Sequence, residues 1–275
     1  MSVFSFYDIE QTNQCNLACP CCSNRLRLRT KGRMSPDVFA DIAKQIGDHM
    51  GAKRRRARVC LHGLGEPLLS PHLDENLSLL DSMGFRNVDL STNGMLLNDT
   101  MITMLCEHPC LSWVRVSLNS SIKEVAEKIQ GDLYDFDRVV SNIKNLQKSS
   151  PGFRIVVQQM SVRGVSESPR DMLRLVGDGV SVKRKTYHTF ANLVPPNDLA
   201  YSRPHEGCVF SSHLFIHWDG DIVGCCIDDT KSQVIGHVSD GIFSEKMLAR
   251  RMHLRERLEK EEFGYLPMCA RCKNA

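Results

Sequence analysis

Short apolar runs and amphipathic stretches alternate along the chain up to about residue 205. The apolar runs are rich in β-branched side chains and predict strands at Val3–Ile9, Arg58–Leu61, Asn87–Ser91, Trp113–Leu118, Arg154–Met160 and Val182–Phe190. Helical spacing of apolar residues predicts helices at Pro36–Met50, His72–Met83, Asp99–Cys106, Ile122–Ile129, Phe136–Gln147 and Arg170–Val176. Strands that alternate with helices predict an α/β fold, with a parallel sheet covered by helices.

The pattern changes after Gly207. Two apolar runs, His213–His217 and Asp221–Val223, flank an Asp-Gly turn, which predicts a β-hairpin. A charged helix is predicted at Ser244–Lys260. We therefore expect two domains, an α/β domain over residues 1–206 and a small hairpin-plus-helix domain over residues 207–275.

Composition narrows the class of protein. The chain has 275 residues and a formal net charge of +3, which is too small to indicate a nucleic-acid partner. No apolar run is long enough to span a membrane, and the first residues lack the regions of a secretory signal. Twelve cysteines without such a signal indicate a reducing compartment and metal or catalytic thiols. We expect a cytoplasmic protein, with a solvated loop at the basic run Lys53–Arg58.

Three cysteines follow the first predicted strand in the spacing C-x-x-x-C-x-x-C. They are Cys15, Cys19 and Cys22. Cysteine thiolates hold Fe–S clusters, and three of them leave one iron of a [4Fe–4S] cluster open to another ligand. A zinc site is the alternative, although such sites usually have paired C-x-x-C units or nearby histidines. Cys21, directly before Cys22, competes with it as a ligand.

A second group of cysteines lies near the C-terminus. It comprises Cys208, the doublet Cys225-Cys226, and the C-x-x-C pair Cys269 and Cys272. This arrangement around a hairpin and a helix predicts a metal site, either an Fe–S cluster or a structural zinc ion. The thiols expected to be small buried hydrophobes are Cys60, Cys106 and Cys110.

Polar and glycine-rich segments mark the ends of the next three predicted strands. They contain Gly63, Gly65, Glu66 and Pro67 at the second strand, Thr92 and Asn93 at the third, and Ser117 and Asn119 at the fourth. Each segment alone could be a turn. Their repeated position, at the edge where barrel enzymes place their chemistry, indicates one site shared with the cysteines.

Together these motifs resemble the radical S-adenosylmethionine (SAM) superfamily. The resemblance implies a partial (β/α)6 barrel, open on one side, and a [4Fe–4S] cluster held by Cys15, Cys19 and Cys22 whose open iron chelates SAM. It also implies that the strand-end residues bind SAM, with Glu66 balancing its ammonium group. One electron, from a flavodoxin- or ferredoxin-type donor, then cleaves SAM to a 5′-deoxyadenosyl radical that removes hydrogen from a C–H bond.

The C-terminal cysteines resemble the SPASM and twitch extensions of the same superfamily. Those extensions hold auxiliary [4Fe–4S] clusters, here with Cys208, Cys225, Cys269 and Cys272 as the implied ligands. The chain ends shortly after the last of these, which is typical of the shorter twitch form.

Members of similar length and layout epimerise or dehydrogenate aminoglycosides and aminocyclitols. We expect a small polar substrate, a carbohydrate or aminocyclitol, that is epimerised at a carbinol carbon with Cys226 as the hydrogen donor. The alternatives are dehydrogenation to a ketone with the auxiliary cluster as electron acceptor, modification of a ribosomal peptide, and a non-enzymatic electron carrier or zinc-stabilised binding module. Candidate substrate contacts are Gln158, Lys183, Lys185, Tyr187, His188 and His205.

Overall fold

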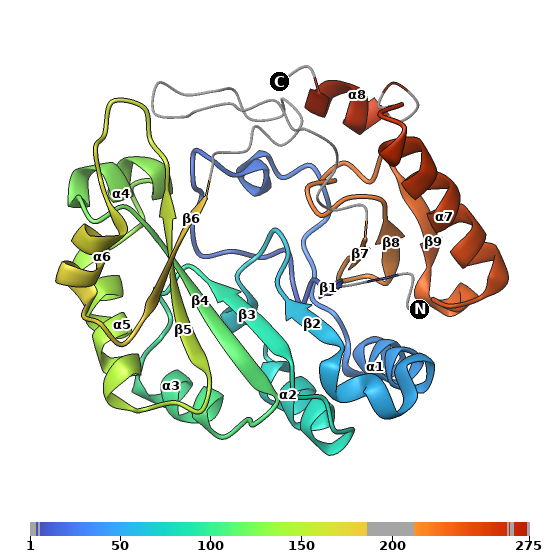
Figure 1. Ribbon diagram of the computed structural model, residues 1–275, viewed down its shortest axis with the longest axis horizontal. Helices are drawn as coiled ribbons and strands as arrows, with labels where there is room; N and C mark the ends of the chain where they lie inside the picture. Colours follow the sequence, from blue (N-terminus) through green and yellow to red (C-terminus); the bar gives the residue numbers. More distant parts are fainter. Residues whose placement is uncertain (1–3, 5, 186–211, 263, 265–266, 274–275) are drawn as a thin grey trace.

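The structure is a computed structural model that describes residues 4, 6–185, 212–262, 264 and 267–273. Its strands form one nine-stranded sheet in the order β6-β5-β4-β3-β2-β1-β7-β8-β9 (Figure 1). The strands are β1 (Phe6–Ile9), β2 (Arg58–Leu61), β3 (Val88–Thr92), β4 (Leu111–Asn119), β5 (Arg154–Met160), β6 (Ser181–Lys185), β7 (His213–Ile216), β8 (Asp221–Val223) and β9 (Val234–His237). Strands β1 to β7 pair in parallel, whereas β8 and β9 pair antiparallel.

Helices cover the outer side of the parallel strands (Figure 1). They are α1 (Pro36–Met50), α2 (Leu73–Ser82), α3 (Asp99–Cys106), α4 (Lys123–Gln130), α5 (Phe136–Lys148) and α6 (Pro169–Val176). Two further helices follow in the C-terminal part: α7 (Glu245–Glu259), which packs beside β9, and α8 (Pro267–Lys273). Helix α1 shows how the sequence sets an end: the Ser35 side chain accepts a hydrogen bond from the Val38 amide, and Pro36 occupies the first turn.

The two faces of the parallel sheet differ in character because side chains alternate along a strand. In β1, Tyr7 and Ile9 are buried in the core shared with Phe39 of α1. Asp8, between them, lies on the opposite face, which is the inner side of the barrel. The helices therefore pack on an apolar face, while the inner face can carry polar side chains.

The α/β fold with a partial (β/α)6 barrel is confirmed. Every predicted helix and strand forms, with ends that differ by a few residues. The predicted strand Val182–Phe190 runs past the described residues after Lys185. Strand β9 and helix α8 were not predicted, because neither segment has apolar residues at a regular strand or helix spacing. The basic run was expected to be a loop, but residues 51–56 form a 3-10 helix.

The C-terminal hairpin continues the barrel sheet. Strand β7 pairs in parallel with β1, with Phe6 opposite His213 and Ile9 opposite Ile216. The division into residues 1–206 and 207–275 stays a prediction. None of the helices that the structure describes combines the length and apolarity that a bilayer crossing would need.

Candidate functional site

The cysteine loop, residues 10–34, leaves the end of β1 and brings four thiols together. The Cys22 amide donates to the Cys19 carbonyl at 3.0 Å. A hydrogen bond with Cys21, together with burial, raises the pKa of Cys19, and the neighbouring Cys22 and Cys15 raise it further. Burial raises the pKa of Cys22 to about 12. These raised pKa values disfavour the thiolates. A bound cation favours them instead, because ligation stabilises the thiolate, so these cysteines fit an Fe–S cluster.

Hydrogen bonds to the backbone fix the shape of the cysteine loop. Asn13 Nδ2 donates to the Thr30 carbonyl at 2.8 Å, and Asn13 Oδ1 accepts from the Gly32 amide at 2.8 Å. Asn24 Nδ2 donates to the Leu64 carbonyl at 2.6 Å, which ties the loop to the segment after β2. These hydrogen bonds therefore leave the backbone that carries the thiols with few other conformations.

Gly65 lies against this loop. A Cβ added at Gly65 would stand 2.2 Å from the Thr12 carbonyl oxygen and 2.6 Å from that of Gln14. At Gly63 an added Cβ would meet the Glu10 side chain at 2.5 Å. These contacts explain the glycines: the segment after β2 must approach the cysteine loop more closely than a side chain permits.

Gln130, at the end of α4, links the cysteine loop to β4. Its Oε1 accepts from the Cys19 thiol at 3.2 Å, and its Nε2 donates to the Ser117 carbonyl at 2.5 Å. The side chain is 3% exposed. The sequence offered no motif for this contact, because the two partners are far apart along the chain.

Glu66 joins the ends of β2 and β3. Its carboxylate accepts from the Leu68 amide at 3.1 Å and from the Asn93 amide at 2.8 Å. Burial raises the pKa of Glu66 to about 7, although hydrogen bonds from Asn93, Thr92 and Leu68 oppose the shift. Asn93 Nδ2 in turn donates to Asn16 Oδ1 at 2.8 Å. The predicted strand-end residues thus meet beside the cysteine loop.

The ends of β4 and β5 continue this edge. Ser117 Oγ lies 3.2 Å from Gln158 Oε1. Asn119 has φ of 69°, in the left-handed region. Lys183 and Lys185 on β6 follow Gln158 on the same inner face, since Lys183 is opposite Gln158 in the parallel register. Three of the predicted substrate contacts lie outside the described residues: Tyr187, His188 and His205.

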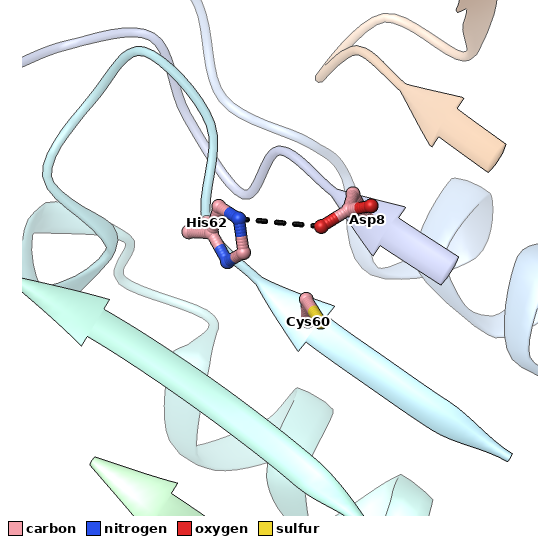
Figure 2. A group of neighbouring side chains, drawn as sticks. All are labelled: Asp8, Cys60 and His62. Carbon is pink, nitrogen blue, oxygen red and sulfur yellow. Dashed lines mark ion pairs between the residues drawn. The ribbon is translucent and has the colours of Figure 1, made fainter. Parts of the chain in front are cut away.

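A charged network that the sequence did not reveal lines the middle of the barrel. Figure 2 shows Asp8 of β1 facing His62, with Cys60 of β2 beside them. Asp8 Oδ1 is 3.2 Å from His62 Nε2, and Asp8 Oδ2 is 2.7 Å from His213 Nδ1. The ligand atoms of Asp8, Cys60 and His62 lie within 4.8 Å of one another. The Asp8 carboxylate already lies between the imidazoles of His62 and His213, and Arg58 is close. The group of Asp8, Cys60 and His62 therefore fits a hydrogen-bonded network better than a metal site.

Asp89 forms the next part of this network. It is fully buried, and its Oδ2 accepts from Arg58 Nε at 2.8 Å and from Arg115 Nη2. Cys60 is buried as predicted, and so is Cys110. The expectation for Cys106 is wrong: it is exposed, because it lies on the last turn of α3.

The C-terminal cysteines gather around the end of β8. A hydrogen bond with Cys226, opposed by burial, lowers the pKa of the Cys225 thiol. Gln233 Nε2 donates to Cys269 Sγ at 3.6 Å, and helix α8 carries Cys272. Cys208 lies outside the described residues. Soft thiol donors on two neighbouring segments, the one after β8 and helix α8, fit an Fe–S cluster.

Arg29 connects this region to the cysteine loop. Its guanidinium pairs with Glu10 at 2.9 Å and with Asp229, just after the Cys225-Cys226 doublet, at 3.0 Å. Asp229 also contributes to the raised pKa of Cys22, after burial and the nearby thiols. The two cysteine groups therefore lie on either side of one buried ion-pair network.

The comparison with protein families decides the identity. The model of the radical SAM superfamily matches residues 9–176. The chain belongs to this superfamily. A second model, the SPASM iron–sulfur cluster-binding domain, matches residues 208–273. The radical SAM protein therefore uses SAM, a SAM-binding [4Fe–4S] cluster and an auxiliary [4Fe–4S] cluster.

Curated relatives have varied activities. A probable GTP 3′,8-cyclase of Methanothermobacter marburgensis is 34% identical over 96 residues, which cover 35% of this chain and 30% of that protein. A tungsten-containing aldehyde ferredoxin oxidoreductase cofactor-modifying protein of Pyrococcus furiosus is 24% identical over 79% of this chain and 69% of its own length. The matched part spans less than half of the first two relatives, 30% of one and 43% of the other.

Solved structures share the fold. BtrN in complex with AdoMet and 2-DOIA has a TM-score of 0.66 at 18% identity and covers 99% of this chain and 93% of its own. Streptococcus suis SuiB bound to precursor peptide SuiA has a TM-score of 0.64 at 14% identity, over 89% of this chain and 66% of its own. The anSMEcpe structure with bound AdoMet has a TM-score of 0.64 at 17% identity, over 98% and 88%. At these identities the similarity shows the fold alone.

Proposed function

We propose that this radical SAM enzyme epimerises a small, hydroxyl-bearing substrate at a carbinol carbon, with Cys226 as the hydrogen donor. When bound, SAM and its cluster supply a radical that removes a hydrogen atom from a C–H bond. The proposed ligands of this cluster are Cys15, Cys19 and Cys22, and those of the auxiliary cluster are Cys208, Cys225, Cys269 and Cys272. The proposed SAM pocket is lined by Gly63, Gly65, Glu66, Pro67, Thr92, Asn93, Ser117 and Asn119.

The position of Cys226 carries the proposal. Desolvation of its ammonium group lowers the pKa of Lys185 to about 8, and the nearby Cys226 thiol opposes this shift. Lys185 ends β6 on the inner face of the barrel. A partly buried thiol close enough to act on the charge of Lys185 supports the proposed donor role of Cys226.

In the proposed hydrogen transfer, Cys226 gives a hydrogen atom to the substrate radical. The S–H bond of Cys226 breaks, and a C–H bond forms on the opposite face of the substrate carbon from the one that lost its hydrogen. The product is the epimer and a thiyl radical on Cys226. One electron from a flavodoxin- or ferredoxin-type protein and one proton restore the thiol.

The barrel interior supports a polar substrate. Its wall carries an amide at Gln158 and charged groups at Arg115, Lys183 and Lys185, whereas the opposite face of β4 and β5 is mostly apolar. Hydroxyl groups need such hydrogen-bonding partners when they leave water. Dehydrogenation to a ketone is the second candidate, because the same wall suits the same substrates.

Cys226→Ala tests the proposal. Cys106→Ala is the matched control, because the Cys106 thiol is exposed and lies far from Cys226 in the sequence. Both variants are incubated anaerobically in heavy water with SAM and a panel of sugar phosphates and aminocyclitols. We expect both to form 5′-deoxyadenosine, and only Cys106→Ala to give an epimer with deuterium at one carbon. Undiminished epimer from Cys226→Ala would overturn the thiol-donor assignment, and a carbonyl product from the parent would establish dehydrogenation instead.

A further inference from the structure

Strand β6 presents two lysines to the inside of the barrel. In the parallel register, Lys183 is opposite Gln158 and Lys185 is opposite Met160. Gln158 is in turn opposite Ser117, whose hydroxyl lies 3.2 Å from its Oε1. Neighbouring residues in a parallel register share a face, so both lysines lie on the inner wall, about 7 Å apart along the strand.

The positive charge of this wall is only partly balanced by the described residues, among which the Cys226 thiol acts on Lys185. Arg115 of β4 donates to the buried Asp89, but Asp89 also accepts from Arg58, so one carboxylate serves two guanidinium groups. Neither Lys183 nor Lys185 has an ion-pair partner in the part of the chain that the structure describes. The wall formed by β4, β5 and β6 therefore carries a surplus of positive charge.

The lysines and Arg115 act on one another. Although the Lys185 side chain as a whole is exposed, desolvation of its ammonium group lowers its pKa to about 8, and the charges of Arg115 and Lys183 lower it further. Burial also lowers the pKa of His62 across the barrel, and Arg115 and Lys185 add to that effect. An anion bound among these groups would remove the repulsion.

Gln158 gives independent evidence for a ligand with an acceptor oxygen. Its side chain is 3% exposed. Its Nε2 donor has no hydrogen-bond partner among the residues that the structure describes. A buried N–H donor without an acceptor is costly, and this one lies directly beside Lys183 in the register. An acceptor oxygen held by the lysines would satisfy it.

We propose that the substrate carries an anionic group, a phosphate or a carboxylate, which binds to Lys183, Lys185 and the Gln158 amide on the inner wall of the barrel. This inference rests on the proposed function, because the same cavity holds the substrate. It narrows the substrate class: an aminocyclitol without an acidic group would add positive charge to a positive wall. A sugar or cyclitol that carries a phosphate or a carboxylate fits.

Strand β6 also contains a position for a matched control variant, Arg184. Arg184 lies between the two lysines, is exposed like them, and is opposite Gln159 on the outer face. Lysines on an edge strand can also serve only to prevent aggregation. Lys183→Gln/Lys185→Gln removes charge from the inner wall, whereas Arg184→Gln removes charge from the same strand without touching that wall.

The experiment measures binding of inorganic phosphate, and separately of acetate, to the anaerobically reconstituted holoenzyme by calorimetry. We expect the parent and Arg184→Gln to bind with affinities within about twofold of each other, and the double variant to bind roughly tenfold or more weakly, because charge-assisted hydrogen bonds are lost. Stronger binding of phosphate than acetate would assign a phosphorylated substrate, and the reverse a carboxylated one. No binding to the parent, or equal loss in both variants, would overturn the inference.

A second readout does not depend on the variants folding. Acetylation of the parent's lysines, mapped by peptide mass spectrometry, should be slowed by phosphate at Lys183 and Lys185 and not at Lys44, which is exposed on α1. Uniform protection would overturn the inference. Formation of 5′-deoxyadenosine is followed in the same samples, so phosphate binding at the lysines without epimer from any substrate would contradict the proposed function alone.

Discussion

Arg29 Nε donates to Asp229 Oδ1 at 3.0 Å, across 200 positions of the chain. The same guanidinium donates to both carboxylate oxygens of Glu10, at 3.0 and 2.9 Å. The side chains of all three residues are at most 5% exposed. One buried cation thus joins the end of β1, the cysteine loop and the segment after the Cys225-Cys226 doublet.

Arg29→Met should destabilise the protein strongly. The variant leaves the carboxylates of Glu10 and Asp229 buried without their cation, and losing one partner of a buried pair costs about 3–5 kcal/mol. Denaturant unfolding of the holoprotein measures the effect. Lys44→Met, which breaks the exposed pair with Asp48, should cost less than about 1 kcal/mol. Equal losses in the two variants would contradict a buried network.

Glu66 should be protonated in the folded protein at mildly acidic pH. Burial raises its pKa from 4.5 to about 7. Because the folded state holds the proton more tightly, the resulting stability is fully present below pH 4.5 and is lost as the pH rises to about 7. Infrared spectroscopy of the SAM-free protein should show a carboxylic-acid band that disappears near neutral pH and is missing from Glu66→Gln. A band that disappears near pH 4.5, the ordinary value, would refute the shift.

Gly65→Ala should displace the cysteine loop. The new Cβ would stand 2.2 Å from the Thr12 carbonyl, and neither backbone can yield without moving the other. We expect the variant to retain less iron after reconstitution and to unfold at lower denaturant concentration. Gly152→Ala is the control, since nothing lies within 4 Å of a Cβ there. Full iron retention by Gly65→Ala would mean that iron binding does not require the close approach of residue 65 to the Thr12 carbonyl.

The sequence predicted the elements that depend on local patterns. Alternating strands and helices follow from apolar spacing, and the three spaced cysteines follow β1 as the sequence predicted. The sequence predicted Gly65 as part of the site, and the structure adds a contact that no pattern showed: an added Cβ there would meet the Thr12 carbonyl. Patterns along the chain predict which face of a helix or strand a residue occupies. They do not predict which residues pack against that face.

The long-range polar contacts could not be predicted. Arg29 reaches Asp229 and Gln130 reaches Cys19 only after the barrel has formed. Asp8 lies between the apolar residues Tyr7 and Ile9 of β1, so the sequence pattern did not single it out. The charge surplus on β6 depends on the register with β5, which no single sequence reveals. Such contacts need the fold before they can be recognised.

The iron and sulfide content of anaerobically reconstituted protein tests the central claim, that this chain holds two separate [4Fe–4S] clusters. The parent is compared with the Cys15→Ala/Cys19→Ala/Cys22→Ala variant. The account predicts about eight iron and eight sulfide per chain in the parent and about four of each in the variant. About four iron in the parent together with one zinc would make the C-terminal site structural, and no iron at all would contradict the account.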